Sequence, residues 1–151
     1  MKNKLISLFY LFFPLIIGGI IGLITSNYTD YNTLIKPPLS PPSILFPIVW
    51  TIIYLLMGTS YFIIQKTDNS TSKIDFIYYL QLFVNALWSI IFFVFEWEFF
   101  SIIWIILLDI LVLYMIYLFY KKVKLSAYLN FLYLVWVLFA TYLTTAIYIL
   151  N

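Results

Sequence analysis

Apolar residues fill five long runs of this chain, and polar residues fall mainly between the runs. Each run holds about 20 residues, the length that a helix needs to cross the hydrocarbon core of a membrane. A strand of a membrane barrel alternates apolar and polar residues over about ten positions, whereas these runs are continuous over about twice that length. The pattern therefore predicts five transmembrane helices, over Leu5–Ile24, Ser43–Ile64, Ile74–Phe95, Phe99–Tyr120 and Ala127–Leu150.

Short polar segments join the runs. The longest is Thr25–Pro42, and none has enough residues to form a second domain. We therefore predict a single domain over residues 1–151, with the fold of an all-α membrane protein built as a bundle of five transmembrane helices. The chain shows no internal repeat, and five helices cannot divide into two equal halves, which argues against an inverted-repeat transporter.

Hydrophobic residues make up 65% of the chain and charged residues 9%. A soluble domain is about 45–50% apolar and about 25% charged, so the composition excludes a water-soluble globular fold. The sequence contains no His and no Cys, which removes the commonest catalytic base, the commonest zinc and haem ligand, and thiolate chemistry. We expect no metal site and no obligatory cofactor, and the net charge of +2 gives no indication of a nucleic-acid partner.

The lysines predict how the bundle is oriented. Seven of them lie in the N-terminal segment or in the second and fourth connections, at positions 2, 4, 66, 73, 121, 122 and 124. The opposite side carries Lys36 alone. Because cytoplasmic loops carry an excess of Lys and Arg, we expect a multi-pass protein of the cell membrane. Its N-terminus should lie in the cytoplasm, and its first loop and C-terminus outside.

Polar groups inside the predicted spans are informative because each is costly in lipid. Asp109 and Asn85 each lie ten residues from the outer end of their helix, and Ala140 with Thr141 lies at the same depth in the last helix. Trp50 and Trp88 lie seven residues from the outer ends of theirs. At about 1.5 Å per residue, these groups form one layer roughly 10–15 Å below the outer surface.

Helical spacing places several of these residues on common faces: Gln81, Asn85, Trp88 and Phe92; Trp50 and Tyr54; Trp136, Ala140 and Leu143. The layer therefore predicts a pocket walled by Trp and Tyr, with a few amides and one carboxyl. Such a pocket suits a planar aromatic or sterol-like ligand. An isolated amide in a membrane helix more often bonds to a neighbouring helix, which is the better interpretation of Gln81 alone. For Asp109 a structural and a functional role both stay open.

The first loop is rich in proline, at positions 37, 38, 41 and 42, which forces extended geometry. A stiff loop above a pocket is either a lid or a rigid connector, and the sequence does not separate the two. Ser43 is a candidate N-cap for the second helix.

Small and aromatic residues give weaker indications. Gly18 and Gly22 form a GxxxG step, which predicts a packing face within the bundle or between protomers. Trp97 fits the aromatic belt at the membrane surface, and Trp104 is expected to face lipid or another subunit.

Three segments carry a family resemblance. The proline-rich stretch Lys36–Pro42 is followed by Phe46–Gly58 (FPIVWTIIYLLMG), the third run contains Gln81–Ser89 (QLFVNALWS), and the fifth contains Tyr133–Leu143 (YLVWVLFATYL). In this order and spacing they resemble the TspO/MBR family, which includes bacterial tryptophan-rich sensory proteins and the mitochondrial translocator protein, also called the peripheral benzodiazepine receptor.

The resemblance implies a five-helix homodimer that binds porphyrins, sterols and benzodiazepine-type ligands beneath the first loop. The positions that match the family's ligand pocket are Tyr31, Pro42, Trp50, Tyr54, Asn85, Trp88, Ser89, Asp109, Trp136, Ala140 and Leu143. The sterol motif of the last helix requires a basic residue beyond its Tyr. No basic residue follows Tyr142 or Tyr148, so the sequence favours porphyrin over sterol.

Three functions stay open on these grounds. The first is a porphyrin receptor or carrier in contact with membrane lipid, with a sensory, stress-regulatory or transport role. The second, implied by the resemblance to some relatives, is an enzyme for light- and oxygen-dependent porphyrin breakdown, in which Trp50 and Trp136 would take part. The sequence shows no catalytic base for it. The third is a channel or transporter, which a single buried Asp and the lack of a repeat disfavour.

Overall fold

Five helices that are long and apolar enough to cross a membrane make up most of the described chain. The computed structural model describes residues 4–26 and 34–151, and the regular structure in these ranges is helical. In chain order the elements are α1 (Lys4–Ser26), α2 (Leu45–Lys66), α3 (Ser72–Ser89), the π-helix η2 (Ile90–Val94), α4 (Glu98–Tyr120), α5 (Lys124–Tyr128) and α6 (Phe131–Leu150). The predicted all-α fold of a multi-pass membrane protein is confirmed, with η2 completing the third span and α5 beginning the fifth.

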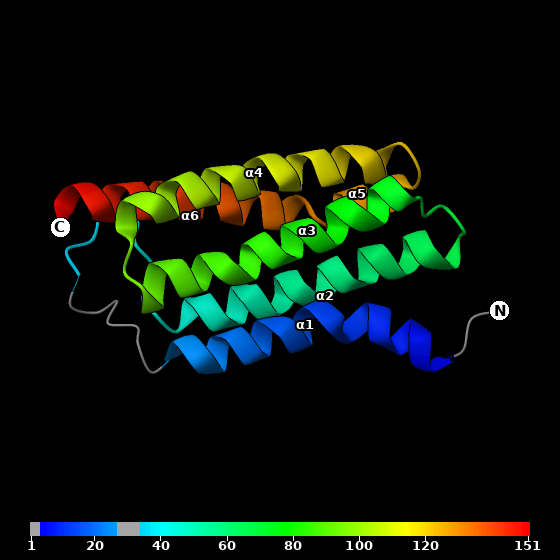
Figure 1. Ribbon diagram of the computed structural model, residues 1–151, viewed down its shortest axis with the longest axis horizontal. Helices are drawn as coiled ribbons and strands as arrows, with labels where there is room; N and C mark the ends of the chain where they lie inside the picture. Colours follow the sequence, from blue (N-terminus) through cyan, green and yellow to red (C-terminus); the bar gives the residue numbers. More distant parts are fainter. Residues whose placement is uncertain (1–3, 27–33) are drawn as a thin grey trace.

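The helices lie side by side along the long axis of the molecule (Figure 1). α1 lies at one edge and packs on α2, whereas α4 lies on the opposite side and packs on both α3 and α6. The start of α1 and the connections α2–α3 and α4–α5 share one end of the bundle. We call this the lysine-bearing end, because it carries the lysines at positions 4, 66, 73, 121, 122 and 124.

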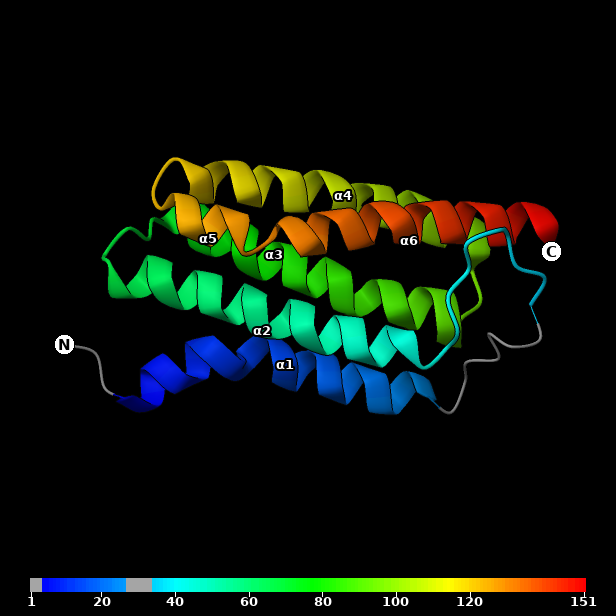
Figure 2. The same cartoon turned by 180° about the vertical axis from the view of Figure 1, so that it is seen from behind.

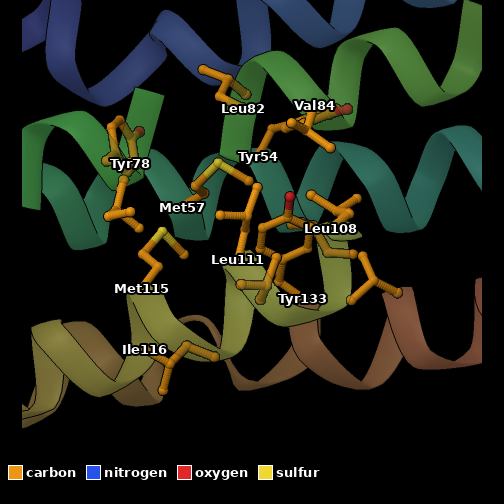
Figure 3. Close-up of a cluster of buried hydrophobic side chains, with 14 of the residues drawn as sticks. Tyr54, Met57, Tyr78, Leu82, Val84, Leu108, Leu111, Met115, Ile116 and Tyr133 are labelled. Carbon is orange, nitrogen blue, oxygen red and sulfur yellow. The ribbon is translucent and has the colours of Figure 1, made fainter. Parts of the chain in front are cut away.

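A core of buried side chains joins α2, α3, α4 and α6. Met57 and Met115 are 0% exposed, and Figure 3 shows them among Tyr78, Leu82 and Leu111. Lipid tails are as apolar as these side chains, so close packing rather than exclusion of water favours the contact. Methionine suits this role because its flexible thioether fills irregular gaps.

The fifth span is interrupted, whereas the sequence predicts a continuous helix over Ala127–Leu150. At the break, the backbone N–H of Asn130 donates to the carbonyl of Ala127 at 3.0 Å instead of continuing the α-helical pattern to Ser126. The side-chain amide of Asn130 donates to the Ser126 carbonyl at 3.0 Å and to Ser60 Oγ on α2 at 2.9 Å. The break therefore follows from a side chain that competes with the helix backbone and ties the span to α2.

The proline-rich loop is tied to α6. The Asn151 side chain donates to the carbonyl of Ile35 at 2.9 Å and accepts from its N–H at 3.2 Å, and Tyr142 Oη donates to the carbonyl of Pro38 at 2.7 Å. Figure 2 shows the described part of the loop crossing α6 before it enters α2. Leu39 has a φ of 70°, a left-handed conformation that costs roughly 1–2 kcal/mol for a residue with a Cβ. The loop is held on both sides of Leu39, because the Pro38 carbonyl accepts from Tyr142 and Ser40 Oγ donates to the Pro37 carbonyl at 2.7 Å.

Ser43 does not cap α2, contrary to the prediction. The N-cap position is Ile44, which already has helical angles and makes no side-chain cap bond. A turn supplies the first acceptors instead, since the N–H of Leu45 donates to the carbonyl of Pro42 at 3.0 Å. Backbone carbonyls therefore satisfy N–H groups that a side chain would otherwise serve.

Candidate functional site

A cavity of about 590 Å³ lies between α1, α2, α6 and the end of the third span, far from the lysine-bearing end. Its described lining consists of Leu15, Gly18, Gly19, Ile21, Gly22, Leu23, Thr25 and Ser26 of α1; Ser43, Phe46, Pro47, Trp50, Thr51 and Tyr54 at the start of α2; Trp88, Ser89, Phe92 and Phe93; and Trp136, Ala140, Leu143, Thr144 and Ile147 of α6. This described lining contains no Lys, Asp or Glu. The cavity is suited to a mainly apolar occupant.

Aromatic rings from several helices form the walls. Trp50 stacks on Tyr54 within α2, with ring centroids 5.4 Å apart and planes 25° apart. Trp88 stacks on Phe92 in the third span at 5.3 Å and 12°, and Trp136 of α6 meets Phe46 edge to face at 5.9 Å. Such offset-stacked and edge-to-face arrangements are the preferred aromatic contacts.

A wider helical turn brings two consecutive phenylalanines to the cavity. In η2 the N–H of Phe95 donates to the carbonyl of Ile90 at 3.0 Å, a bond that spans five residues instead of four. Both Phe92 and Phe93 line the cavity in this turn. π-turns of this kind are uncommon and frequently occur at functional sites, and the sequence alone predicts only a regular helix here.

The glycines of α1 have two different roles. A Cβ added to Gly18 would lie 2.2 Å from the Tyr54 ring, so Gly18 permits close packing of α1 on α2. A Cβ added to Gly19 or Gly22 would meet nothing within 4 Å, and both residues line the cavity. The GxxxG step is therefore a packing contact within the bundle at Gly18 and open space at Gly22.

A chain of buried hydrogen bonds begins at the cavity wall. Tyr54 Oη donates to Asn85 Oδ1 at 2.9 Å, and Asn85 Nδ2 donates to Tyr133 Oη at 2.7 Å. Tyr133 Oη in turn donates to Gln81 Oε1 at 2.7 Å, and Gln81 Nε2 donates to the carbonyl of Tyr78 at 2.9 Å. Asn85 is thus not part of the described lining but lies behind it, where it holds Tyr54 in place beside Trp50.

Asp109 lies at a different interface. Its Oδ2 accepts a hydrogen bond from Thr141 Oγ1 at 2.6 Å, which joins α4 to α6, and its buried Oδ1 has no partner among the described residues. α4 contributes no residue to the described lining. The layer that the sequence predicts from depth alone therefore contains residues that face different neighbours.

The structure gathers seven of the predicted ligand-binding residues around the cavity: Trp50, Tyr54, Trp88, Ser89, Trp136, Ala140 and Leu143. Pro42 belongs to the loop and, like Asn85 and Asp109, is absent from the described lining. Tyr31 lies outside the described residues. The described loop residues before Ser43 do not line the cavity either, so they form a connector bonded to α6 rather than a wall of the site.

Other lining residues were not predicted as ligand contacts. Phe46 and Thr144 lie four residues from Trp50 and Ala140 on the same helix faces, so extending each face by one turn finds them. The cavity-facing Gly19 and Gly22 have no such signal, because glycine is ordinary in membrane helices.

Two tryptophans differ in whether their ring N–H group has a hydrogen-bond acceptor. Trp104, which the sequence predicts to face lipid or another subunit, also bonds within the bundle, since its ring N–H donates to the carbonyl of Val84 on α3 at 2.8 Å. Trp88 is 7% exposed, and its ring N–H has no acceptor among the described residues. An unpaired buried donor is unfavourable, so an occupant with an acceptor atom at this wall would stabilise it.

Comparison with known proteins identifies similar chains. A model of the TspO/MBR family matches residues 10–150. A tryptophan-rich protein TspO of Chlorobaculum tepidum is 35% identical over 140 residues, covering 87% of this chain and 89% of that protein. One of the same name from Archaeoglobus fulgidus is 38% identical over 127 residues, covering 83% and 82%. A tryptophan-rich sensory protein of Cereibacter sphaeroides is 36% identical over 63 residues, covering 42% and 39%.

Proposed function

The chain belongs to the TspO/MBR family, and we propose that it is a membrane receptor or carrier that holds a porphyrin in the aromatic cavity. One observation carries the proposal. Trp50, Trp88 and Trp136 come from three separate spans and all line a single cavity of about 590 Å³. Packing within the bundle does not require three indole rings around open space, whereas a planar π-system needs ring faces and edges of this kind.

Size and polarity agree with this ligand class. Pockets for small molecules commonly measure about 300–1,000 Å³ and combine an apolar lining with a few polar groups that set orientation. Here the polar groups are hydroxyls such as those of Thr51 and Ser89, and the ring N–H of Trp88. A carboxylate or carbonyl oxygen at the edge of the ligand would supply the acceptor that this N–H lacks.

The composition constrains how a porphyrin is held. The chain has no His and no Cys, so a metalloporphyrin would find none of the axial nitrogen or thiolate ligands that haem proteins commonly use. Binding would therefore rest on stacking and shape, and a metal-free porphyrin should bind about as well as a metallated one. A relative described as a sensory protein supports a role in which occupancy of the cavity is the signal.

Protoporphyrin binding to the purified protein in detergent tests the proposal. The visible absorption band of the porphyrin should be followed, because this signal does not disappear when a Trp is replaced. We expect Trp50→Ala to weaken binding about tenfold, a loss of about 1.4 kcal/mol. Trp97→Ala is the matched control, since Trp97 is 56% exposed and is absent from the described lining.

A second variant tests the cavity itself. Gly22→Leu adds a side chain where a Cβ meets no atom within 4 Å, so it should reduce porphyrin binding by filling space while leaving the melting temperature nearly unchanged. Binding that survives undiminished in both Trp50→Ala and Gly22→Leu would show that porphyrin binds elsewhere or not at all.

A further inference from the structure

A groove with a volume of about 570 Å³ runs along the exposed face of α4. It is lined by Ile110, Leu113, Tyr114, Ile116, Tyr117 and Tyr120, all from this one helix. Leu113 and Tyr117 are 57% and 54% exposed. The groove is apolar in the middle of the span and aromatic where α4 approaches the lysine-bearing end. It is separate from the cavity lined by Trp50, Trp88 and Trp136, hereafter the tryptophan cavity.

Three lysines gather at the aromatic end of the groove. Lys73 of α3 lies over the Tyr114 ring with its Nζ 5.7 Å from the centroid. Lys121, directly after α4, lies 5.2 Å from the centroid of Tyr117, and Lys124 of α5 lies 5.4 Å from that of Tyr120. The Tyr114 and Tyr117 rings are themselves stacked with centroids 6.4 Å apart. Three elements therefore bring cations to one row of rings.

The charge of this region is unbalanced. The chain from residue 110 to its end contains no acidic residue. Asp75, two residues from Lys73, accepts hydrogen bonds from Tyr61 at 2.6 Å, from Gln65 at 3.1 Å and from Ser70. Its carboxylate is thus engaged with α2 and the α2–α3 connection. The three lysines of the groove therefore outnumber this one carboxylate, which is held toward α2, and the end of the groove keeps a net positive charge that attracts an anion.

We propose that this face of α4 is a docking site for an anionic phospholipid. One acyl chain lies along Ile110 and Leu113, and the phosphate lies at the end of the groove against Lys73, Lys121 and Lys124. The arrangement matches the amphiphile, since the groove lies at the depth of acyl chains and the lysines at the helix end, where headgroups are found. Lysines close to a membrane surface attract anionic lipids in this way, and tyrosines favour the same level.

A second copy of the chain fits this face poorly. Copies inserted in the same orientation have their lysine-bearing ends on the same side of the membrane. An interface through this groove would bring the lysines of one protomer against those of the other, and like charges placed together oppose association. An anionic lipid neutralises the same charges. The proposal is independent of the tryptophan cavity, so either one can fail without the other.

Native mass spectrometry of the detergent-solubilised protein tests the proposal. The protein is mixed with equal amounts of phosphatidylglycerol and phosphatidylcholine, and the bound lipids are counted. We expect phosphatidylglycerol to bind preferentially, and the triple variant Lys73→Gln/Lys121→Gln/Lys124→Gln to lose about fivefold in its affinity for each lysine removed. Glycerol phosphate without acyl chains should not compete at the same concentration, because the groove supplies part of the binding.

The matched control is the triple variant Lys4→Gln/Lys66→Gln/Lys122→Gln, which removes the same charge from the same end of the bundle. It should keep the preference for phosphatidylglycerol. An equal loss in both triple variants would overturn the proposal, because net charge alone would then explain the preference. Full competition by glycerol phosphate would also overturn it, since the site would then bind free phosphates.

Cross-linking separates the lipid from a second copy. The chain has no native Cys, so Leu113→Cys places a single thiol in the groove. In lipid bilayers we expect this thiol to form no disulfide-linked dimer under mild oxidation, and a photoreactive acyl chain on phosphatidylglycerol to label residues 110–120. An efficient Leu113→Cys disulfide, or labelling spread evenly over all the spans, would overturn the proposal.

Discussion

At the residue scale, Asn85 shows how one buried amide supports the candidate site. It is 3% exposed and uses both ends of its side chain, accepting from Tyr54 and donating to Tyr133. A polar side chain in a membrane helix commonly bonds to another helix, and Asn85 does so while fixing a residue of the cavity wall. Asn85 therefore both joins the helices and supports the wall of the candidate site.

Replacement of Asn85 should cost more stability than replacement of the Tyr54 hydroxyl. Asn85→Ala leaves the Tyr54 hydroxyl without its acceptor and removes the bond that Tyr133 Oη accepts, while Tyr133 still donates to Gln81. An unpaired buried polar group costs about 1–3 kcal/mol. Tyr54→Phe leaves only the Asn85 oxygen unpaired. We expect Asn85→Ala to lower the free energy of unfolding by about 2 kcal/mol and Tyr54→Phe by about half as much. Thermal unfolding in detergent, followed by circular dichroism, measures both. Equal losses of stability in the two variants would show that Asn85 does not link Tyr54 to Tyr133 as described.

At the element scale, the position of α1 depends on glycines. α1 packs on α2 at two points of close approach, where a Cβ on Gly58 would lie 1.9 Å from the carbonyl oxygen of Leu11 and a Cβ on Gly18 would lie 2.2 Å from the Tyr54 ring. Further along, Gly19 and Gly22 face the cavity. The same residue type therefore brings the two helices together at Gly18 and Gly58 and leaves room for an occupant at Gly19 and Gly22.

Alanine substitutions should separate these two uses of glycine. Gly58→Ala collides with backbone, which cannot rotate away, so α1 must shift and the melting temperature should fall clearly. Gly22→Ala collides with nothing and gains helix propensity, which is worth up to about 1 kcal/mol, so it should be neutral or slightly stabilising. Thermal unfolding of the two variants in the same detergent provides the comparison. A fall in melting temperature with Gly22→Ala would contradict the open space at that position.

The two irregular turns show where element prediction from sequence fails. The apolar runs predict the extent of the third and fifth spans to within three residues at either end. They do not predict the π-turn at Ile90–Val94 or the break at Asn130. At the break the Asn130 side chain bonds both to the Ser126 carbonyl and to Ser60, which lies 70 residues away, and hydrophobic periodicity contains no information on such contacts.

At the scale of the whole molecule, charge is segregated along the bundle axis. Lysines gather at one end, whereas the tryptophan cavity and the loop bonded to α6 lie toward the other. The excess of lysine predicts that the first end faces the cytoplasm, which would open the cavity region toward the outside of the cell.

Cysteine labelling in intact cells tests this orientation. Leu39 is 84% exposed in the loop near the cavity end, and Thr67 is exposed in the connection at the lysine-bearing end. Since the chain has no native Cys, a membrane-impermeant maleimide should label Leu39→Cys in intact cells and Thr67→Cys only after the cells are permeabilised. The reverse pattern would mean that the protein inserts the other way round.

The sequence by itself predicts five helices that are long and apolar enough to cross a membrane, because the length and apolar character of each run favour a helix in lipid. It also identifies Trp50, Trp88 and Trp136 as candidate ligand contacts, since all three lie inside the apolar runs. Only the tertiary structure decides which side of each helix faces a neighbour. Asn85 and Asp109 lie in the same predicted layer as Trp50 and Trp88, yet Asn85 lies behind the cavity wall and Asp109 joins α4 to α6. Depth follows from residue number at a constant rise per residue, whereas the direction of a side chain depends on how all the helices pack together.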